Sequence, residues 1–131
     1  MQINSPKVSL QQSSEDVFNF LSEVKNFESL MPNNTSKFEI LEDDTFIFAL
    51  SGMPEIVLKK KEQNPYSTIV LGAAGGKLDF SLTAHIDSLS ENESHVALSF
   101  VGDFNPMMAM MIKGPITKFV ETLVHNLITA I

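Results

Sequence analysis

Four methionines stand close together near the start of the last apolar stretch of this 131-residue sequence: Met107, Met108, Met110 and Met111. A methionine side chain is unbranched and polarisable, so a group of them forms an adaptable apolar surface that suits hydrophobic ligands. We therefore expect this group to bind a hydrophobic ligand rather than to catalyse a reaction. Gap filling in a packed core is the competing interpretation of the same four side chains.

Side chains for acid–base or metal chemistry are sparse. His85 and His95 are expected on the solvent faces of strands, and His125 is expected opposite the buried face of a helix. The histidines lack metal-binding spacing, and the chain has no cysteine. Glu55 and Asp103 are the carboxylates nearest the expected binding end, where a solvated rim charge is the simpler interpretation of each. We therefore expect no catalytic residue, no metal site and no cofactor.

The charge of the chain limits its partners. The formal net charge is −7, and all nine basic residues are lysines. Arginine forks are the usual means of recognising phosphates and guanine edges, so we expect no nucleic-acid partner. No apolar run approaches the length of a membrane span, and no secretory signal is seen, so we expect a cytoplasmic protein without stable membrane insertion. The sequence leaves the oligomeric state open, a homodimer included.

The elements that must position these side chains follow from periodicity and turn chemistry. A first strand is expected over Ile3–Leu10, then a helix after Ser13 and a short helical turn over Phe27–Met31. A long helix is expected from about Met107 to Ile131, with a kink where Gly114-Pro115 interrupts it. Six antiparallel strands are expected between the short and long helices: Lys37–Glu42, Thr45–Leu50, Glu55–Gln63, Ser67–Leu71, Lys77–Leu89 and Ser94–Phe104.

This order of elements resembles the START-like (SRPBCC) superfamily of helix-grip proteins, which includes pollen-allergen-like and polyketide-cyclase-like domains. The resemblance rests on Val17–Ser22 leading to Phe27–Pro32, and on Asp103–Met107 before the last helix. It covers essentially the whole chain, as one domain over residues 1–131. It implies an α+β fold, in which a curved seven-stranded antiparallel sheet grips the C-terminal helix around an apolar pocket. Members of the superfamily bind lipids, sterols or polyketides, and some are enzymes.

Hairpin order and strand alternation place the expected pocket. Successive turns alternate between the two ends of a sheet, so those at 51–54, 72–76 and 103–106 meet beside the start of the long helix. The loop Pro32–Ser36 is expected at the same end. We expect six ligand-binding residues at the mouth and four deeper inside: Gly52, Met53, Phe104, Met107, Met108 and Met111, then Phe80, Leu82, Phe100 and Ile112. A cavity of about 300–1,000 Å³ would suit a ligand of fatty-acid or polyketide size.

Three functions agree with the sequence. The favoured one is binding or carriage of a hydrophobic small molecule, such as a lipid, isoprenoid or polyketide-like compound. The alternatives are a polyketide cyclase- or dehydratase-like enzyme and a co-chaperone-like module for protein interaction. An ionisable group converging on an open apolar cavity would favour the enzyme, and a cavity filled by side chains would favour the interaction module.

Overall fold

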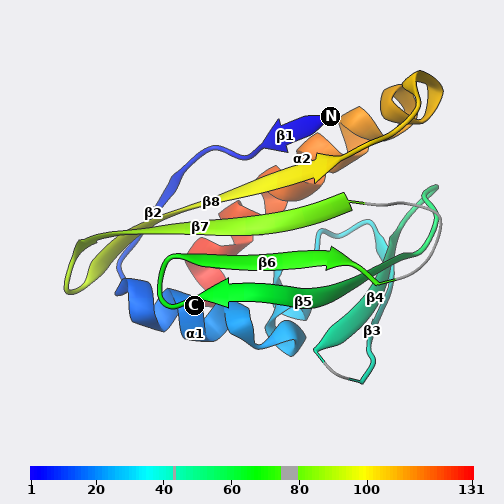
Figure 1. Ribbon diagram of the computed structural model, residues 1–131. Coiled ribbons are helices and arrows are strands. Elements are labelled where there is room, and N and C mark those ends of the chain that lie inside the picture. The colour runs from blue at the N-terminus through cyan, green and yellow to red at the C-terminus, as the bar shows by residue number, and fades with distance from the viewer. Residues whose placement is uncertain (43, 75–79) are drawn as a thin grey trace.

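The computed structural model describes residues 1–42, 44–74 and 80–131 (Figure 1). Gly75, Gly76 and the first residues of the strand expected at Lys77–Leu89 lie outside these ranges. The helices are α1 (Ser14–Ser22), the 3-10 helix η1 (Val24–Leu30) and α2 (Pro106–Ala130). The strands are β1 (Gln2–Asn4), β2 (Val8–Leu10), β3 (Thr35–Ile40), β4 (Thr45–Leu50), β5 (Ile56–Asn64), β6 (Thr68–Ala73), β7 (Phe80–Ser90) and β8 (Glu93–Gly102).

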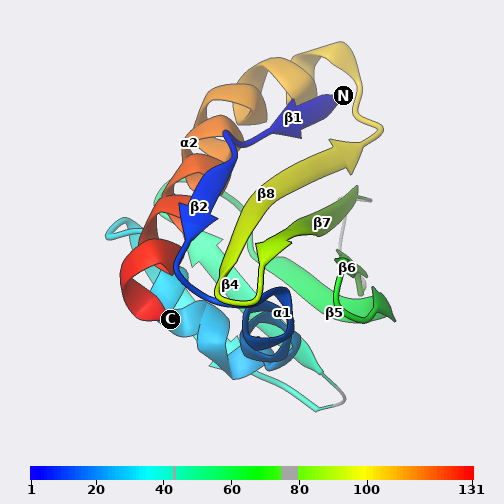
Figure 2. The same cartoon turned by 90° about the vertical axis from the view of Figure 1, so that its left-hand side faces the viewer.

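All strand pairs of the sheet are antiparallel, in the order β1-β8-β7-β6-β5-β4-β3, with β2 also paired to β8. The sheet curves, and α2 lies along its concave side (Figure 2). The expected α+β helix-grip architecture is thereby confirmed. Turns alternate between the two ends, so the β4–β5 turn and the β8–α2 connection share one end (Figure 1).

The sheet has eight strands rather than the expected seven, because the first strand is split in two. Ser5, Pro6 and Lys7 separate β1 from β2, and proline has no N–H to donate to a neighbouring strand. The Ser5 hydroxyl substitutes for part of the missing pairing, since it accepts a hydrogen bond from the Leu98 N–H at 2.8 Å. Both short strands therefore still pair with β8.

Local signals explain the boundaries of the helices. Ser13 caps α1 by accepting from the Asp16 N–H at 3.1 Å, and Asn105 caps α2 by accepting from the Met108 N–H at 2.8 Å. Pro106 follows at the first helical position, where a missing N–H costs nothing. Helix α2 continues through Pro115 as one element, and its buried face is apolar: Ile112, Ile116, Phe119, Val120, Leu123, Val124 and Leu127.

Aromatic rings fill much of the space between the sheet and the helices. The ring of Phe46 lies 5.5 Å from that of Phe27, 5.4 Å from that of Phe38 and 5.9 Å from that of Phe48. A separate void of about 10 Å³ lies among buried leucine, isoleucine, alanine and phenylalanine side chains. That volume is about one water molecule in size, so the core at this point is closely packed. No helix in the described ranges is both long and apolar enough to span a bilayer.

Candidate ligand-binding groove

A groove runs beside the middle of α2, between that helix and the connection from η1 to β3. Its volume is about 430 Å³, within the range of about 300–1,000 Å³ that is common for small-molecule sites. We term it the loop–helix groove. Three parts of the chain line it: Pro32, Asn33 and Asn34 of the connection, Leu50 at the end of β4, and Pro115, Lys118, Phe119 and Thr122 of α2.

The helical wall of the groove is one face of α2. Pro115, Lys118, Phe119 and Thr122 have the spacing i, i+3, i+4 and i+7, which places them together along one side of a helix. The Thr122 hydroxyl donates to the Lys118 carbonyl at 2.8 Å and is therefore already engaged with the helix backbone. This leaves the exposed Pro115 and the Lys118 stem as the main contact surface of that wall, with the buried Phe119 ring beneath them.

Hydrogen bonds hold the opposite wall in place. The Ser51 N–H and hydroxyl both donate to the Asn34 carbonyl, at 2.9 Å and 3.2 Å. The Asn126 side-chain amide donates to the Leu30 carbonyl at 3.0 Å, and so ties α2 to the end of η1. The connection is thus fixed to the sheet on one side and to the helix on the other. These bonds set the width of the groove.

Lys118 is the charged residue in the lining of the groove. It forms no ion pair with another residue in the described part of the chain. The groove therefore combines apolar walls with one lysine and the side-chain amides of Asn33 and Asn34.

The deeper residues of the expected pocket lie together in the core. The rings of Phe80 and Phe100 are 4.9 Å apart, and those of Phe100 and Phe104 are 6.1 Å apart, so the three form a stacked row. Leu82 borders the small void, and Ile112 is buried on α2. Strand alternation thus correctly indicated which side chains turn inward. Their role in ligand binding stays a prediction.

The methionines of α2 divide into two groups. Met107, Met110 and Met111 are 74%, 83% and 65% exposed, whereas Met108 is half-buried against the core. Gap filling does not describe the three exposed side chains, which form a stripe with i, i+3 and i+4 spacing. They lie on the first turns of α2, before Gly114-Pro115, and make an exposed apolar surface on the side of the helix away from its buried face.

Gly52 and Met53 lie in the β4–β5 turn, directly after the end of β4. Gly52 has φ of +81°, in the left-handed region that glycine adopts most readily. The Met53 N–H donates to the Leu50 carbonyl at 2.9 Å, and its half-buried side chain packs against the core. Since Leu50 lines the loop–helix groove, this predicted turn borders the groove.

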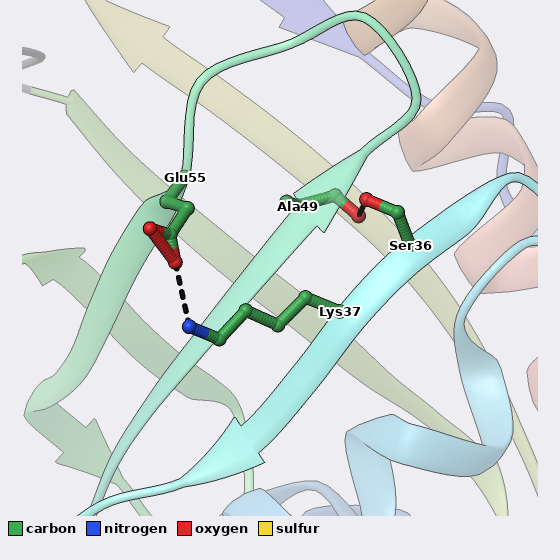
Figure 3. A network of polar contacts seen from close by, with 4 residues as sticks. All are labelled: Ser36, Lys37, Ala49 and Glu55. Atoms are coloured by element: carbon green, nitrogen blue, oxygen red, sulfur yellow. Dashed lines mark hydrogen bonds and ion pairs between the residues drawn. The ribbon is translucent and has the colours of Figure 1, made fainter.

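The three histidines and the carboxylates Glu55 and Asp103 do not line the groove. Glu55 accepts from the Lys37 ammonium at 2.8 Å (Figure 3). This hydrogen bond, together with the negative charge of Glu55, raises the pKa of Lys37. His85 and His125 are exposed and His95 is half-buried, and none of the three lines the groove. Across the described ranges no cluster of three or more histidine, cysteine or acidic side chains could hold a metal ion.

A wider hollow of about 620 Å³ lies where β6, β7 and β8 approach the same end of the sheet. Its lining includes Phe80 and Ser81 but also the charged residues Lys61 and Asp103. Because opposite charges border it, this hollow suits a hydrophobic ligand less well than the groove does.

Sequence reasoning did not select the lining of the groove. The loop Pro32–Ser36 was expected at the same end as the pocket, but none of its residues was selected as ligand-binding. The signal that could have found the site is the four-residue face that starts at Pro115, taken together with the loop that the hydrogen bond between Asn126 and Leu30 brings beside it. The spacing is present in the sequence, and the loop was expected at this end of the sheet, but its contact with this face of the helix is known only from the fold.

No family model matches this sequence, and no curated protein matches it. Solved structures do resemble it. Norcoclaurine synthase from Thalictrum flavum, in complex with dopamine and hydroxybenzaldehyde, superposes with a TM-score of 0.74 at 14% identity, over 99% of this chain and 83% of that one. The protein XoxI from Bacillus cereus gives 0.68 at 11% identity, over 98% and 95%.

A third similar structure is the di-domain ARO/CYC BexL from the BE-7585A biosynthetic pathway. Its TM-score is 0.67 at 13% identity, over 97% of this chain and 46% of the BexL chain. This chain therefore spans about half of that two-domain protein. Together these likenesses show that the protein has the helix-grip fold that its sequence resemblance implied. Identities this low establish the fold and not the activity.

Proposed function

We propose that this protein binds a hydrophobic small molecule, of lipid, isoprenoid or polyketide-like class, in the loop–helix groove beside α2. The observation that carries the proposal is the loop–helix groove. It joins a volume of about 430 Å³ to apolar walls from Pro32, Leu50, Pro115 and Phe119. Apolar walls with a few polar groups at defined positions are the usual composition of a small-molecule site.

The chemistry of the lining favours a ligand with one polar end. An apolar body would contact Pro32 and Pro115 above the buried Leu50 and Phe119, and the Lys118 ammonium or the Asn33 and Asn34 amides would meet an acceptor group. Among the described residues no histidine or carboxylate lines the groove, so general acid–base catalysis there would depend on Lys118. This favours carriage or sensing over the enzyme alternative.

We also propose that the ten residues predicted from the sequence extend this site when α2 moves. A core void of about 10 Å³ leaves no room for a ligand beside Leu82, and a core filled by side chains agrees with the interaction module unless this part of α2 moves. Pro115 withholds one hydrogen bond from the carbonyl of Met111, so the first turns of α2 are held less firmly than the rest. Outward movement of these turns would open the row of Phe80, Phe100 and Phe104 to the exposed methionines.

The test is uptake of an apolar fluorescent probe, together with native mass spectrometry of freshly purified protein. Asn33→Trp places a large ring in the groove from an exposed position, so it should weaken probe binding by about tenfold or more. The matched control is Asn92→Trp, in the exposed turn between β7 and β8, which should leave binding unchanged. Equal binding by both variants, with the fold intact, would remove the groove as the site.

A further inference from the structure

One edge of the sheet has no neighbouring strand in the described parts of the chain. The strand order ends at β3, which pairs with β4 on one side only. Figure 1 shows β3 at the margin of the sheet, beyond β4. An edge strand presents backbone N–H and C=O groups that can pair with another chain. β3 is therefore a surface on which a partner strand could add.

Hydrogen bonding to β4 decides which groups of β3 are free. The Leu41 N–H donates to the Thr45 carbonyl at 2.8 Å, which makes these two residues a hydrogen-bonded pair. Hydrogen-bonded and non-hydrogen-bonded pairs alternate along an antiparallel ladder. The backbone groups of Glu39 and Lys37 therefore face β4, and those of Phe38 and Ile40 face the open edge.

The charges on β3 complement a second copy of the same strand. Lys37 and Glu39 are two residues apart, so both side chains are on the outer face, and both are exposed. When two β3 strands run antiparallel with Phe38 opposite Phe38, each Lys37 lies opposite Glu39 of the other copy. Most charged edge strands repel their own copies. The order Lys-Phe-Glu instead makes this edge attractive to itself.

The ion pairs within one chain leave this arrangement available. Lys37 reaches across β4 to Glu55 (Figure 3), but Glu39 has no ion-pair partner in the part of the chain that the structure describes. In the paired arrangement Lys37 would lie between Glu55 and Glu39 of the second copy. Ile40, which is 44% exposed, would be opposite Ser36 of the second copy and lose part of its contact with water.

We propose that two copies of this chain associate through their β3 strands, antiparallel and centred on Phe38, so that the two sheets become one. The inference is independent of ligand binding, because no residue of β3 lines the loop–helix groove. Backbone hydrogen bonds supply the association, and the two Lys37–Glu39 pairs fix its register.

Sedimentation velocity over about 10 μM to about 1 mM protein tests the association. Glu39→Lys sets two positive charges opposite each other in the paired strands, and Lys37→Glu sets two negative charges there. Each variant alone should therefore dimerise at least about tenfold more weakly. An equimolar mixture of the two variants restores opposite charges at both positions and should recover the dimer. The matched control is Glu91→Lys, which makes the same charge change in the β7–β8 turn and should leave the dimer unaffected.

Amide hydrogen exchange of the unaltered protein gives a second test that needs no variant. The amides of Phe38 and Ile40 should become protected as protein concentration rises, whereas those of Lys37 and Glu39 should be protected at all concentrations by β4. A monomer throughout the concentration range would overturn the proposal. So would a dimer whose affinity the two charge variants leave within about twofold, since such a dimer must use another surface.

Discussion

The ring of Phe119 lies 5.0 Å from the ring of Phe48, with only 11° between the two planes. Phe48 is buried in β4, while Phe119 belongs both to the core face of α2 and to the lining of the loop–helix groove. The floor of the groove is therefore held by direct contact between the sheet and the helix. A change at this contact should alter stability and binding together.

Replacing Phe119 with alanine should lower the free energy of unfolding by about 3–5 kcal/mol, because a buried ring is lost and a cavity remains. That cavity adjoins the groove, so a bulky apolar probe should bind at least as well as before. Urea unfolding followed by probe titration measures both effects. The smaller change Phe119→Leu is the control, and it should cost less. A loss below about 1 kcal/mol for the alanine variant would show that the ring is not packed as described.

Two glycines should respond in opposite ways to alanine. A Cβ at Gly102 would lie 2.5 Å from the Phe104 ring and 2.9 Å from the Phe80 Cβ, so Phe104 must move. We expect Gly102→Ala to destabilise the fold by about 1–3 kcal/mol through overpacking.

A Cβ at Gly114 would meet no other atom within 4 Å. Gly114→Ala in the middle of α2 should therefore stabilise the protein by about 0.5–1 kcal/mol. Thermal unfolding of the two variants in parallel measures the difference. If Gly102→Ala proved neutral, the Phe104 ring would not lie against that strand.

Charges introduced at Met111 and Met108 should have different costs. Met111 is 65% exposed, so Met111→Lys should change the free energy of unfolding by no more than about 0.5 kcal/mol. Met108 is half-buried against the core, and Met108→Lys should cost about 1–3 kcal/mol. If the methionine-bearing turns of α2 form a mouth, Met111→Lys should still weaken uptake of an apolar probe. Unchanged uptake would place the site entirely in the loop–helix groove.

The pair of Lys37 and Glu55 makes a prediction about pH. Its hydrogen bond raises the pKa of Lys37 above the ordinary value of 10.5. The stability that the pair contributes is therefore complete below about pH 10.5 and is lost as pH rises through the higher, folded-state pKa. In Glu55→Gln the pKa of Lys37, followed by NMR, should fall toward its ordinary value. An unchanged pKa would mean that the ion pair does not persist in solution.

The sequence predicted the elements well because their signals are local. A capping asparagine followed by proline marks the start of α2, and alternation along β7 and β8 identified Phe80, Leu82 and Phe100 as inward-facing. The split of the first strand was missed, although Pro6 was visible, because the hydroxyl of Ser5 that replaces the lost pairing bonds to a residue 93 positions away. Long-range contacts of this kind produce no periodic pattern in the amino-acid sequence, so sequence analysis cannot detect them.

The candidate site was predicted less well, for a related reason. Strand parity says which way Phe100 points, but it does not say how closely neighbouring side chains fill the space in front of it. The width of the groove depends on where the Asn126 amide meets the Leu30 carbonyl, which is a property of the packed fold. The burial of each side chain could therefore be inferred from the sequence, whereas the volume of the groove between packed elements could not.

The pairing of β1 with β8 has a consequence for the speed of folding. Gln2 is opposite Val101 in this ladder, and the contact between Asn126 and Leu30 joins positions 96 residues apart. Such contacts pay the entropy of closing a long loop before any neighbouring contact compensates for it. Proteins rich in non-local pairing fold over milliseconds to seconds rather than microseconds. The strands from β3 to β7 can pair as successive hairpins, whereas β1 can pair only after β8 has formed. We therefore expect the pairing of β1 with β8 to be a late step of folding.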